Sequence, residues 1–197
     1  MIPIKPMPAI PGKAFSNKDW IFEPKIDGAR CIAYISNNTV ELKNRRLRSI
    51  TYRYPEIIRS LKQSASDCVL DGETAVFSKG VPSFSSSAVR EQQIQNTRID
   101  YLSKSMPASY IVFDILYLGR ESLMDRPLLD RKSILKAELQ ESDVVTIIDY
   151  LPEDGEAYFK GSPGERSRRH NGQEADFPLS TGGQKPGLGK NQEAANF

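Results

Sequence analysis

The stretch Glu23-Pro24-Lys25-Ile26-Asp27-Gly28-Ala29-Arg30 is the most informative part of this sequence. It joins two runs that have the composition of short strands, residues 20–23 and 31–35. A lysine amine becomes a nucleophile when a nearby cation or partial burial favours its unprotonated form, and Arg30 supplies such a cation. Gly28 permits a tight bend that brings the backbone close to a ligand. The stretch predicts a nucleophilic lysine at an anion-binding turn, and the alternative is an exposed lysine before an ordinary Asp-Gly hairpin.

The composition is that of a globular chain. It has 197 residues, of which 39% are hydrophobic and 26% are charged, enough to bury a core. A net charge of +2 neither requires nor excludes a nucleic-acid partner. Cys31 and Cys68 lie in apolar runs and are expected to be buried, reduced thiols. The prolines near the N-terminus do not fit a signal peptide, and no run is long enough to span a membrane, so we expect a cytoplasmic protein with no membrane partner.

Hairpins alternate with helices along the chain, which favours an α+β fold with mixed or antiparallel sheets and flanking helices over a doubly wound parallel sheet. Asn37-Asn38 is expected to be a hairpin turn. The expected strands cover residues 20–23, 31–35, 40–43, 68–77, 109–118 and 144–150. The expected helices cover residues 54–61, 88–98 and 131–139, with another beginning at 154–160, and residues 78–87 are expected to form a Ser-rich loop.

We expect three parts along the chain. Residues 1–18 are proline-rich and form an N-terminal arm, and residues 19–160 form the main domain. Residues 161–197 are rich in Gly, Gln and Asn and have no apolar periodicity, which is typical of a disordered tail.

Three motifs occur in the order found in one enzyme superfamily. Residues 25–30 resemble the K-x-D-G-x-R signature of ATP-dependent DNA ligases, RNA ligases and mRNA capping enzymes. Leu70-Asp71-Gly72-Glu73 resembles the third motif of that superfamily, and Ile111-Val112-Phe113-Asp114-Ile115-Leu116-Tyr117-Leu118 resembles the next. Flanking segments resemble the ligase domain of bacterial end-joining ligases and small archaeal ligases: Pro6-Met7-Pro8-Ala9, Arg53-Tyr54-Pro55-Glu56, Pro82-Ser83-Phe84 and Pro127-Leu128-Leu129-Asp130-Arg131-Lys132.

The resemblance implies a role for six residues. Lys25 would be the nucleophile, Glu23 would bind the adenine amino group, Arg30 the ribose or phosphate, Arg45 the nucleotide, Glu73 the ribose or a metal ion, and Phe113 would stack on adenine. Ligases commonly read S-R-N-G where this chain reads Asn44-Arg45-Arg46-Leu47, so Arg46 is an alternative to Arg45. Alternatively, Glu73 is a solvated strand residue and Phe113 a core aromatic. Arg45, Arg46, Arg48 and Arg53 are candidates for phosphate contacts, and the alternative for them is a solvated basic face.

The implied protein is the adenylation domain of an ATP-dependent DNA ligase with the nucleotidyltransferase fold. It would use ATP and Mg²⁺, form a lysine-AMP intermediate and pass AMP to the 5′-phosphate of nicked double-stranded DNA in repair or replication. DNA-repair proteins would be partners. The alternatives are an RNA ligase or capping-type nucleotidyltransferase, or a ligase fragment without catalytic activity.

The tail lacks two later motifs of the family, E-G-(I/V)-(M/V)-x-K and W-(V/L)-K-I-K. When the first base of each codon is dropped and synonymous codons are chosen, residues 165–174 can be translated as K-G-L-E-G-I-M-A-K-K. The same shift translates residues 186–193 as P-D-W-V-K-I-K-K. We therefore hypothesise that a frameshift near Lys160 replaced these motifs. The chain as written would then have a truncated catalytic set, and whether it is active stays open.

Overall fold

The computed structural model describes residues 4–6, 10–12, 15–153, 156, 179–182 and 193–196. The chain divides into two compact units. The large unit contains residues 1–6 and 26–147, and the small unit contains residues 7–25 and 148–197. Two boundaries between the units, after residue 25 and after residue 147, therefore fall inside the stretch 19–160 that the sequence suggested as a single domain.

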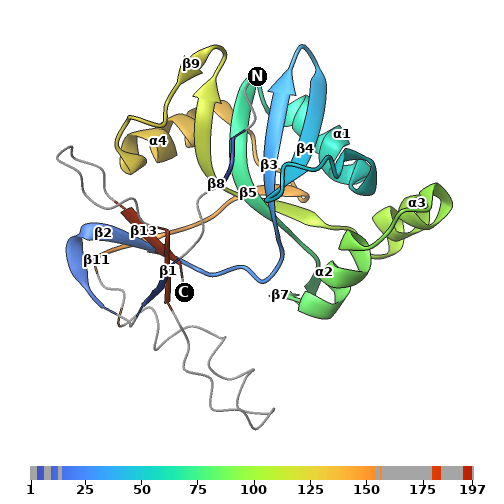
Figure 1. Ribbon diagram of the computed structural model, residues 1–197, viewed down its shortest axis with the longest axis horizontal. Helices are drawn as coiled ribbons and strands as arrows, with labels where there is room; N and C mark the ends of the chain where they lie inside the picture. Colours follow the sequence, from blue (N-terminus) through green and yellow to red (C-terminus); the bar gives the residue numbers. More distant parts are fainter. Residues whose placement is uncertain are drawn as a thin grey trace, which may run out of the picture. The chain divides into compact units, whose positions relative to one another are not determined.

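A mixed six-stranded sheet forms the centre of the large unit (Figure 1). Strand β10 runs parallel to β8, whereas the other neighbours in the sheet are antiparallel. The order is β10-β8-β5-β3-β4, and the short strand β9 (Glu121–Ser122) pairs with β8. The bounds are Ala29–Ser36 for β3, Thr39–Asn44 for β4, Cys68–Ala75 for β5, Ser109–Leu118 for β8 and Val145–Ile147 for β10.

The turn between β3 and β4 is the one expected from the sequence. Asn37 and Asn38 both have positive φ, at 48° and 59°. Asparagine tolerates this region better than most residues, and two successive positive φ values match the right-handed twist of a hairpin. The hairpin prediction is therefore confirmed.

The helices of the large unit are η1 (Thr51–Arg53), α1 (Pro55–Ser64), α2 (Phe84–Glu91), α3 (Asn96–Ser105) and α4 (Leu128–Glu138). Strands β6 (Phe77–Ser78) and β7 (Val81–Pro82) form a small hairpin before α2. The expected loop at 78–87 is wrong, because α2 begins inside it. The Ser83 side chain accepts a hydrogen bond from the backbone N–H of Ser86, so serine starts this helix.

The expected helix at 88–98 is also wrong, since the chain leaves the helical path after Glu91 and a second helix begins at Asn96. Helix α3 is held by tertiary contact, because its apolar residues Ile99 and Leu102 are buried. Its polar sequence gave a weak local signal, and burial of these two side chains compensates for it.

The two faces of the large sheet differ in character. The main apolar cluster includes Cys31, Leu70 and Val112 from the strands, together with Ile57 of α1 and Leu135 of α4. Both helices therefore pack on this face. Cys31 and Cys68 belong to the same cluster as free thiols, as expected.

The opposite face carries a smaller apolar cluster and a group of charged side chains. The cluster consists of Ile32, Tyr34, Val69 and Leu116. Since side chains alternate along a strand, Arg30 shares this face with Ile32. This polar face also carries Glu73, which is directly opposite Arg30.

The small unit is built around strand β2 (Asn17–Glu23). Its sheet has the order β1-β12-β13-β2-β11, in which β1 is Ile10–Gly12, β11 Leu151–Glu153, β12 Leu179–Gly182 and β13 Glu193–Asn196. Phe15 packs edge-on against Trp20 and Phe22, with ring centroids 5.0 and 5.3 Å apart. The expected tail includes β12 and β13, and its other residues lie outside those that the structure describes.

Each helix in the described part of the chain is too short or too polar to cross a membrane.

Candidate active site

Arg30 is fixed on the polar face of the large sheet by two hydrogen bonds. It lies on β3 directly opposite Glu73 of β5. Its Nε donates to Asp71 Oδ1 at 2.6 Å and its Nη2 donates to Asp71 Oδ2 at 2.7 Å. Burial lowers the pKa of the Arg30 guanidinium, but Asp71, Glu73 and Tyr110 together raise that pKa by more, so Arg30 is held as a cation. The bidentate pair gives this cation one orientation.

Phe113 lies next to Arg30 and is half-buried rather than part of the main apolar cluster. The Arg30 Cζ atom is 4.4 Å from the centroid of the Phe113 ring. Pairing between β5 and β8 skips Phe113, because Asp71 pairs with Asp114 and Gly72 pairs with Val112. Phe113 is thus the extra residue of a β-bulge, a feature that re-aims a side chain. Its ring is a flat platform with the Arg30 guanidinium over one face.

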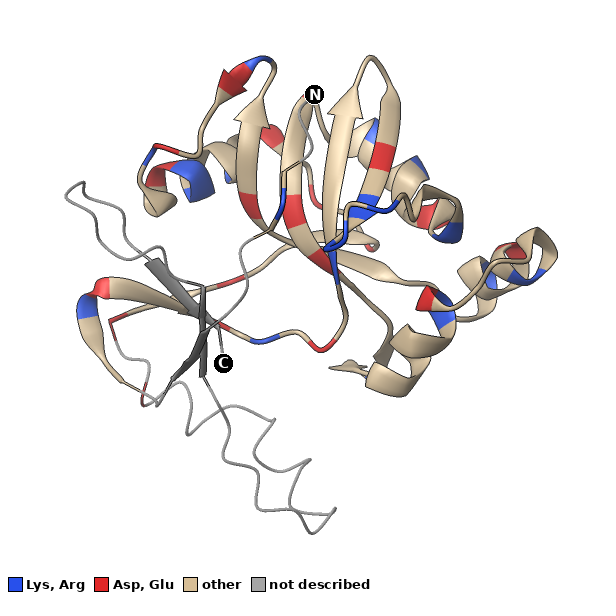
Figure 2. Cartoon of the chain, in the orientation of Figure 1, with Lys and Arg blue, Asp and Glu red and all other residues tan. Residues whose placement is uncertain are grey.

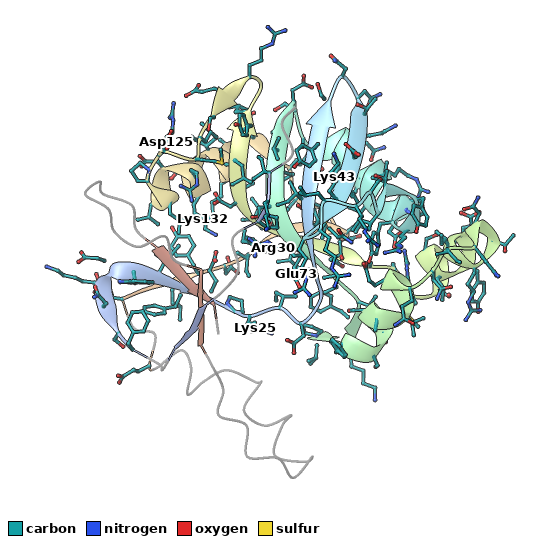
Figure 3. The ribbon with its side chains drawn as sticks, in the orientation of Figure 1. Lys25, Arg30, Lys43, Glu73, Asp125 and Lys132 are labelled. Atoms are coloured by element: carbon teal, nitrogen blue, oxygen red, sulfur yellow. The ribbon has the colours of Figure 1, made fainter. Side chains whose placement is uncertain are left out.

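Glu73 is half-buried on β5, and its stem lies against the turn that precedes β3 (Figure 3). A Cβ atom added at Gly28 would come within 2.9 Å of Glu73 Cγ and would clash with the Thr74 carbonyl oxygen. Glycine at position 28 therefore lets the turn pass close to the strand that carries Glu73. Arg30, Glu73 and Phe113 are brought together on one face by this packing.

Lys25 and Glu23 belong to the small unit. Glu23 is the last residue of β2 and is 2% exposed, whereas Lys25 is exposed in the connection that leads to β3. The placement of both side chains beside Arg30, Glu73 and Phe113 stays a prediction.

Arg45 and Arg46 lie in a tight turn after β4, where basic side chains gather (Figure 2). The Asn44 side-chain oxygen accepts hydrogen bonds from the backbone N–H groups of Arg46 and Arg48, at 3.0 and 3.1 Å. Leu47 has a φ of 60°, in the region that favours glycine. Arg45, Arg46 and Arg48 are all exposed, so the choice between Arg45 and Arg46 stays open.

Four charged residues near Arg30 and Phe113 were not assigned a role from the sequence: Asp71, Asp114, Arg131 and Lys132. Asp71 and Asp114 lie inside the motifs, beside Glu73 and Phe113. Arg131 and Lys132 are the first two residues of the predicted helix 131–139, where two adjacent basic residues resemble a solvated helix face. Only their partners in space distinguish them.

Comparison with known proteins places this arrangement in a family. The model of the family described as "ATP dependent DNA ligase domain" matches residues 6–153. The chain belongs to this ATP-dependent DNA ligase family. The match confirms the resemblance carried by the motifs around Lys25, Glu73 and Phe113.

Individual ligases are similar to the chain over much of its length. It is 34% identical over 143 residues to the multifunctional non-homologous end joining DNA repair protein LigD of Mycobacterium tuberculosis, which covers 71% of the chain and 17% of that protein. It is 32% identical over 136 residues to DNA ligase C of the same organism, covering 68% of the chain and 37% of that protein. A probable DNA ligase of Koribacter versatilis is 32% identical over 121 residues, which are 61% of the chain and 21% of that protein. The chain thus matches well under half the length of each relative.

The fold is similar to that of solved ligases. A mycobacterial DNA ligase D complexed with ATP and MES superimposes with a TM-score of 0.64 at 25% identity, over 97% of this chain and 59% of the other. The ligase domain of M. tuberculosis LigD gives a TM-score of 0.63 at 25% identity, over 96% and 58% of the two chains. The expected α+β nucleotidyltransferase fold is confirmed by these similarities.

Proposed function

We propose that this chain is the adenylation domain of an ATP-dependent DNA ligase and that Lys25 is its nucleophile. Lys25 Nζ attacks the α-phosphate of ATP, a phosphorus–nitrogen bond forms and pyrophosphate leaves. The AMP then passes to the 5′-phosphate of nicked DNA, and the 3′-hydroxyl of the nick displaces it. Family membership together with the grouping of Arg30, Glu73 and Phe113 carries this proposal.

The described residues fit a nucleotide. Phe113 offers a half-buried aromatic ring beside the Arg30 cation, which suits stacking by a purine base. Arg30 is a fixed cation beside it, suited to the ribose or a phosphate, and Glu73 is a carboxylate on the same face. Glu23, at the end of β2, would accept a hydrogen bond from the adenine amino group. Either Arg45 or Arg46 would contact the nucleotide from the turn after β4.

The same residues are compatible with Mg²⁺. No cluster of three potential metal-binding side chains occurs among the residues that the structure describes. Mg²⁺ commonly binds through one or two carboxylates together with substrate phosphates, and Glu73 supplies one carboxylate. The ion would neutralise charge on the phosphates.

The partner in this proposal is nicked double-stranded DNA. Exposed arginines in the turn after β4 are suited to phosphate contacts, which position a protein on a duplex without reading its sequence. DNA-repair proteins would be further partners in the cytoplasm, because end-joining proteins are among the similar proteins.

The test is the intact mass of the chain after incubation with ATP and Mg²⁺. We expect the wild-type chain to gain the mass of one AMP and Lys25→Ala to gain none. Lys18→Ala is the matched control, because Lys18 is another exposed lysine of the same unit. Retention of the adduct in Lys25→Ala would overturn the assignment of the nucleophile. Labelling by GTP instead of ATP would favour a capping-type enzyme, and sealing of nicked RNA but not nicked DNA would favour an RNA ligase.

The tail is tested in the same assay. Sequencing of the coding DNA shows whether the codons for residues 165–174 and 186–193 permit the shifted translation. If they do, we expect the frame-restored chain to form more AMP adduct and to seal nicks better than the chain as written. Equal activity of the two chains would contradict the interpretation of the tail, and no adduct in either chain would contradict the proposed function.

A further inference from the structure

Two adjacent residues of α4 contact the backbone and the neighbour of Phe113, whose ring is the platform proposed to stack on the base. Arg131 and Lys132 are the fourth and fifth residues of this helix. Each of them contacts the bulge of β8 that carries Phe113. Neither residue belongs to the three motifs that identify the superfamily.

Arg131 fixes the residue that follows Phe113. Its Nε and Nη2 atoms donate to the two carboxylate oxygens of Asp114, both at 2.8 Å. A third donor, Nη1, is held by the Arg126 carbonyl oxygen at 2.6 Å. Both side chains are mostly buried, at 13% and 15% exposure. A bidentate pair in such surroundings defines the orientation of both partners.

Lys132 fixes Phe113 through its backbone. Its Nζ donates to the Phe113 carbonyl oxygen at 2.6 Å, and the residue is only 2% exposed. A lysine is almost never fully buried unless its ammonium group is paired. The carbonyl it binds belongs to the bulge, where the ordinary pairing between β5 and β8 is interrupted.

The ion pair between Arg131 and Asp114 is a neighbour of the ion pair between Arg30 and Asp71. Asp114 is directly opposite Asp71 across β5 and β8, so Arg131 and Arg30 each clamp one of two neighbouring carboxylates. Two like charges placed opposite each other on a sheet repel unless each has its own cation. Loss of Arg131 would therefore disturb Asp114 first, then the adjoining Phe113.

We propose that Arg131 and Lys132 are positioning residues that set the orientation of the Phe113 ring for a purine base. The proposal rests on the proposed function for its ligand, but the positioning itself can be measured without nucleotide. Neither residue touches the base; they act through Asp114 and the Phe113 carbonyl.

The first measurement uses a fluorescent reporter at the platform. Trp20 is the only tryptophan, so Trp20→Phe combined with Phe113→Trp places a single indole at the bulge. We expect Arg131→Ala in this background to lower the anisotropy of the indole and increase its quenching by acrylamide, and Arg131→Lys to restore part of the difference. Lys136→Ala is the control, because it removes an exposed cation from the same helix. Equal signals in Arg131→Ala and Lys136→Ala would overturn the proposal.

The second measurement uses the chain with its native Phe113. We expect Arg131→Ala to weaken ATP binding about tenfold, equivalent to about 1.4 kcal/mol, while binding of inorganic tripolyphosphate stays unchanged because the phosphates do not use the platform. Asp114→Asn keeps the shape of the side chain and should give the same selective loss, which provides a second variant if Arg131→Ala unfolds. An equal loss for both ligands would contradict a role at the base. If the wild-type chain binds no ATP while the indole responds as expected, the proposed function fails and the positioning stands.

Discussion

Arg90 offers the sharpest test of what stabilises the large unit. It lies on α2 and is 1% exposed. Its Nη1 donates to the Met106 carbonyl oxygen at 3.0 Å, and its Nη2 donates to the Arg53 carbonyl oxygen at 2.7 Å. The same Nη2 lies 2.8 Å from Glu56 Oε1. One guanidinium therefore links α2 to the segment that precedes α1 and to the segment that follows α3.

The expected cost of Arg90→Ala follows from these contacts. The substitution leaves the Glu56 carboxylate, whose side chain is 8% exposed, without its cation. Glu56 keeps one hydrogen bond, from the Ala108 N–H. Removing one partner of a buried ion pair costs about 3–5 kcal/mol, a large share of the roughly 5–15 kcal/mol by which domains are stable. We expect the free energy of unfolding to fall by about 3–5 kcal/mol.

Urea unfolding followed by circular dichroism measures this loss. Arg59→Ala is the matched control, since it removes an exposed arginine from α1 and should change the free energy of unfolding by less than about 0.5 kcal/mol. A double-mutant cycle with Glu56→Ala should show a favourable coupling energy between the two side chains. A loss below about 1 kcal/mol in Arg90→Ala would refute the reasoning, because it would mean that the buried carboxylate does not need its cation.

Substitutions at three further positions test local geometry and burial. Gly72→Ala should destabilise the chain by about 1–3 kcal/mol, since a Cβ there would lie 2.5 Å from the Ile111 carbonyl oxygen; an unchanged melting temperature would contradict this. Leu47→Gly should be more stable than Leu47→Ala by about 1 kcal/mol in urea unfolding, because only glycine is unstrained at positive φ; the reverse order would show that this turn relaxes. Burial raises the pKa of the Cys68 thiol to about 12, so its contribution to stability is complete below the unfolded pKa and is lost as pH rises toward the folded pKa. Between about pH 9 and about pH 11 the wild-type chain should lose about 1.4 kcal/mol per pH unit more than Cys68→Ala, and parallel losses would exclude this linkage.

Local signals in the sequence predicted five of the six strands of the large sheet, all but the short strand β9. Residues 109–118 form an apolar run long enough for one central strand, and Asn37-Asn38 specifies the turn of a hairpin. These predictions succeeded because turn conformation and apolar alternation depend on neighbouring residues. The break between α2 and α3 was missed because tertiary burial of Ile99 and of Arg90, rather than helix propensity, holds the two helices.

The candidate site likewise contains residues that the sequence predicted and residues that only the structure could assign. Arg30, Glu73 and Phe113 were found from motifs, and the structure groups them on one face of the sheet. The roles of Arg131 and Lys132 depend on the register of β5 against β8 and on the bulge at Phe113. A single sequence contains no direct signal for register or for a bulge, so these two residues could be noticed but not assigned.

The pairing of strand β2 shows why the fold and the reaction place different requirements on the sequence. Strand β2 leads into Lys25, and its neighbours in the small sheet are β11 and β13. Residues 193–196 of β13 pair in parallel with residues 20–23 of β2 through backbone groups. Backbone hydrogen bonds use groups that every residue except proline carries, so many different sequences can form a strand at this position. Catalysis asks for particular side chains at particular positions, and a neighbouring strand without the family's lysines and carboxylate would complete the sheet without completing the reaction.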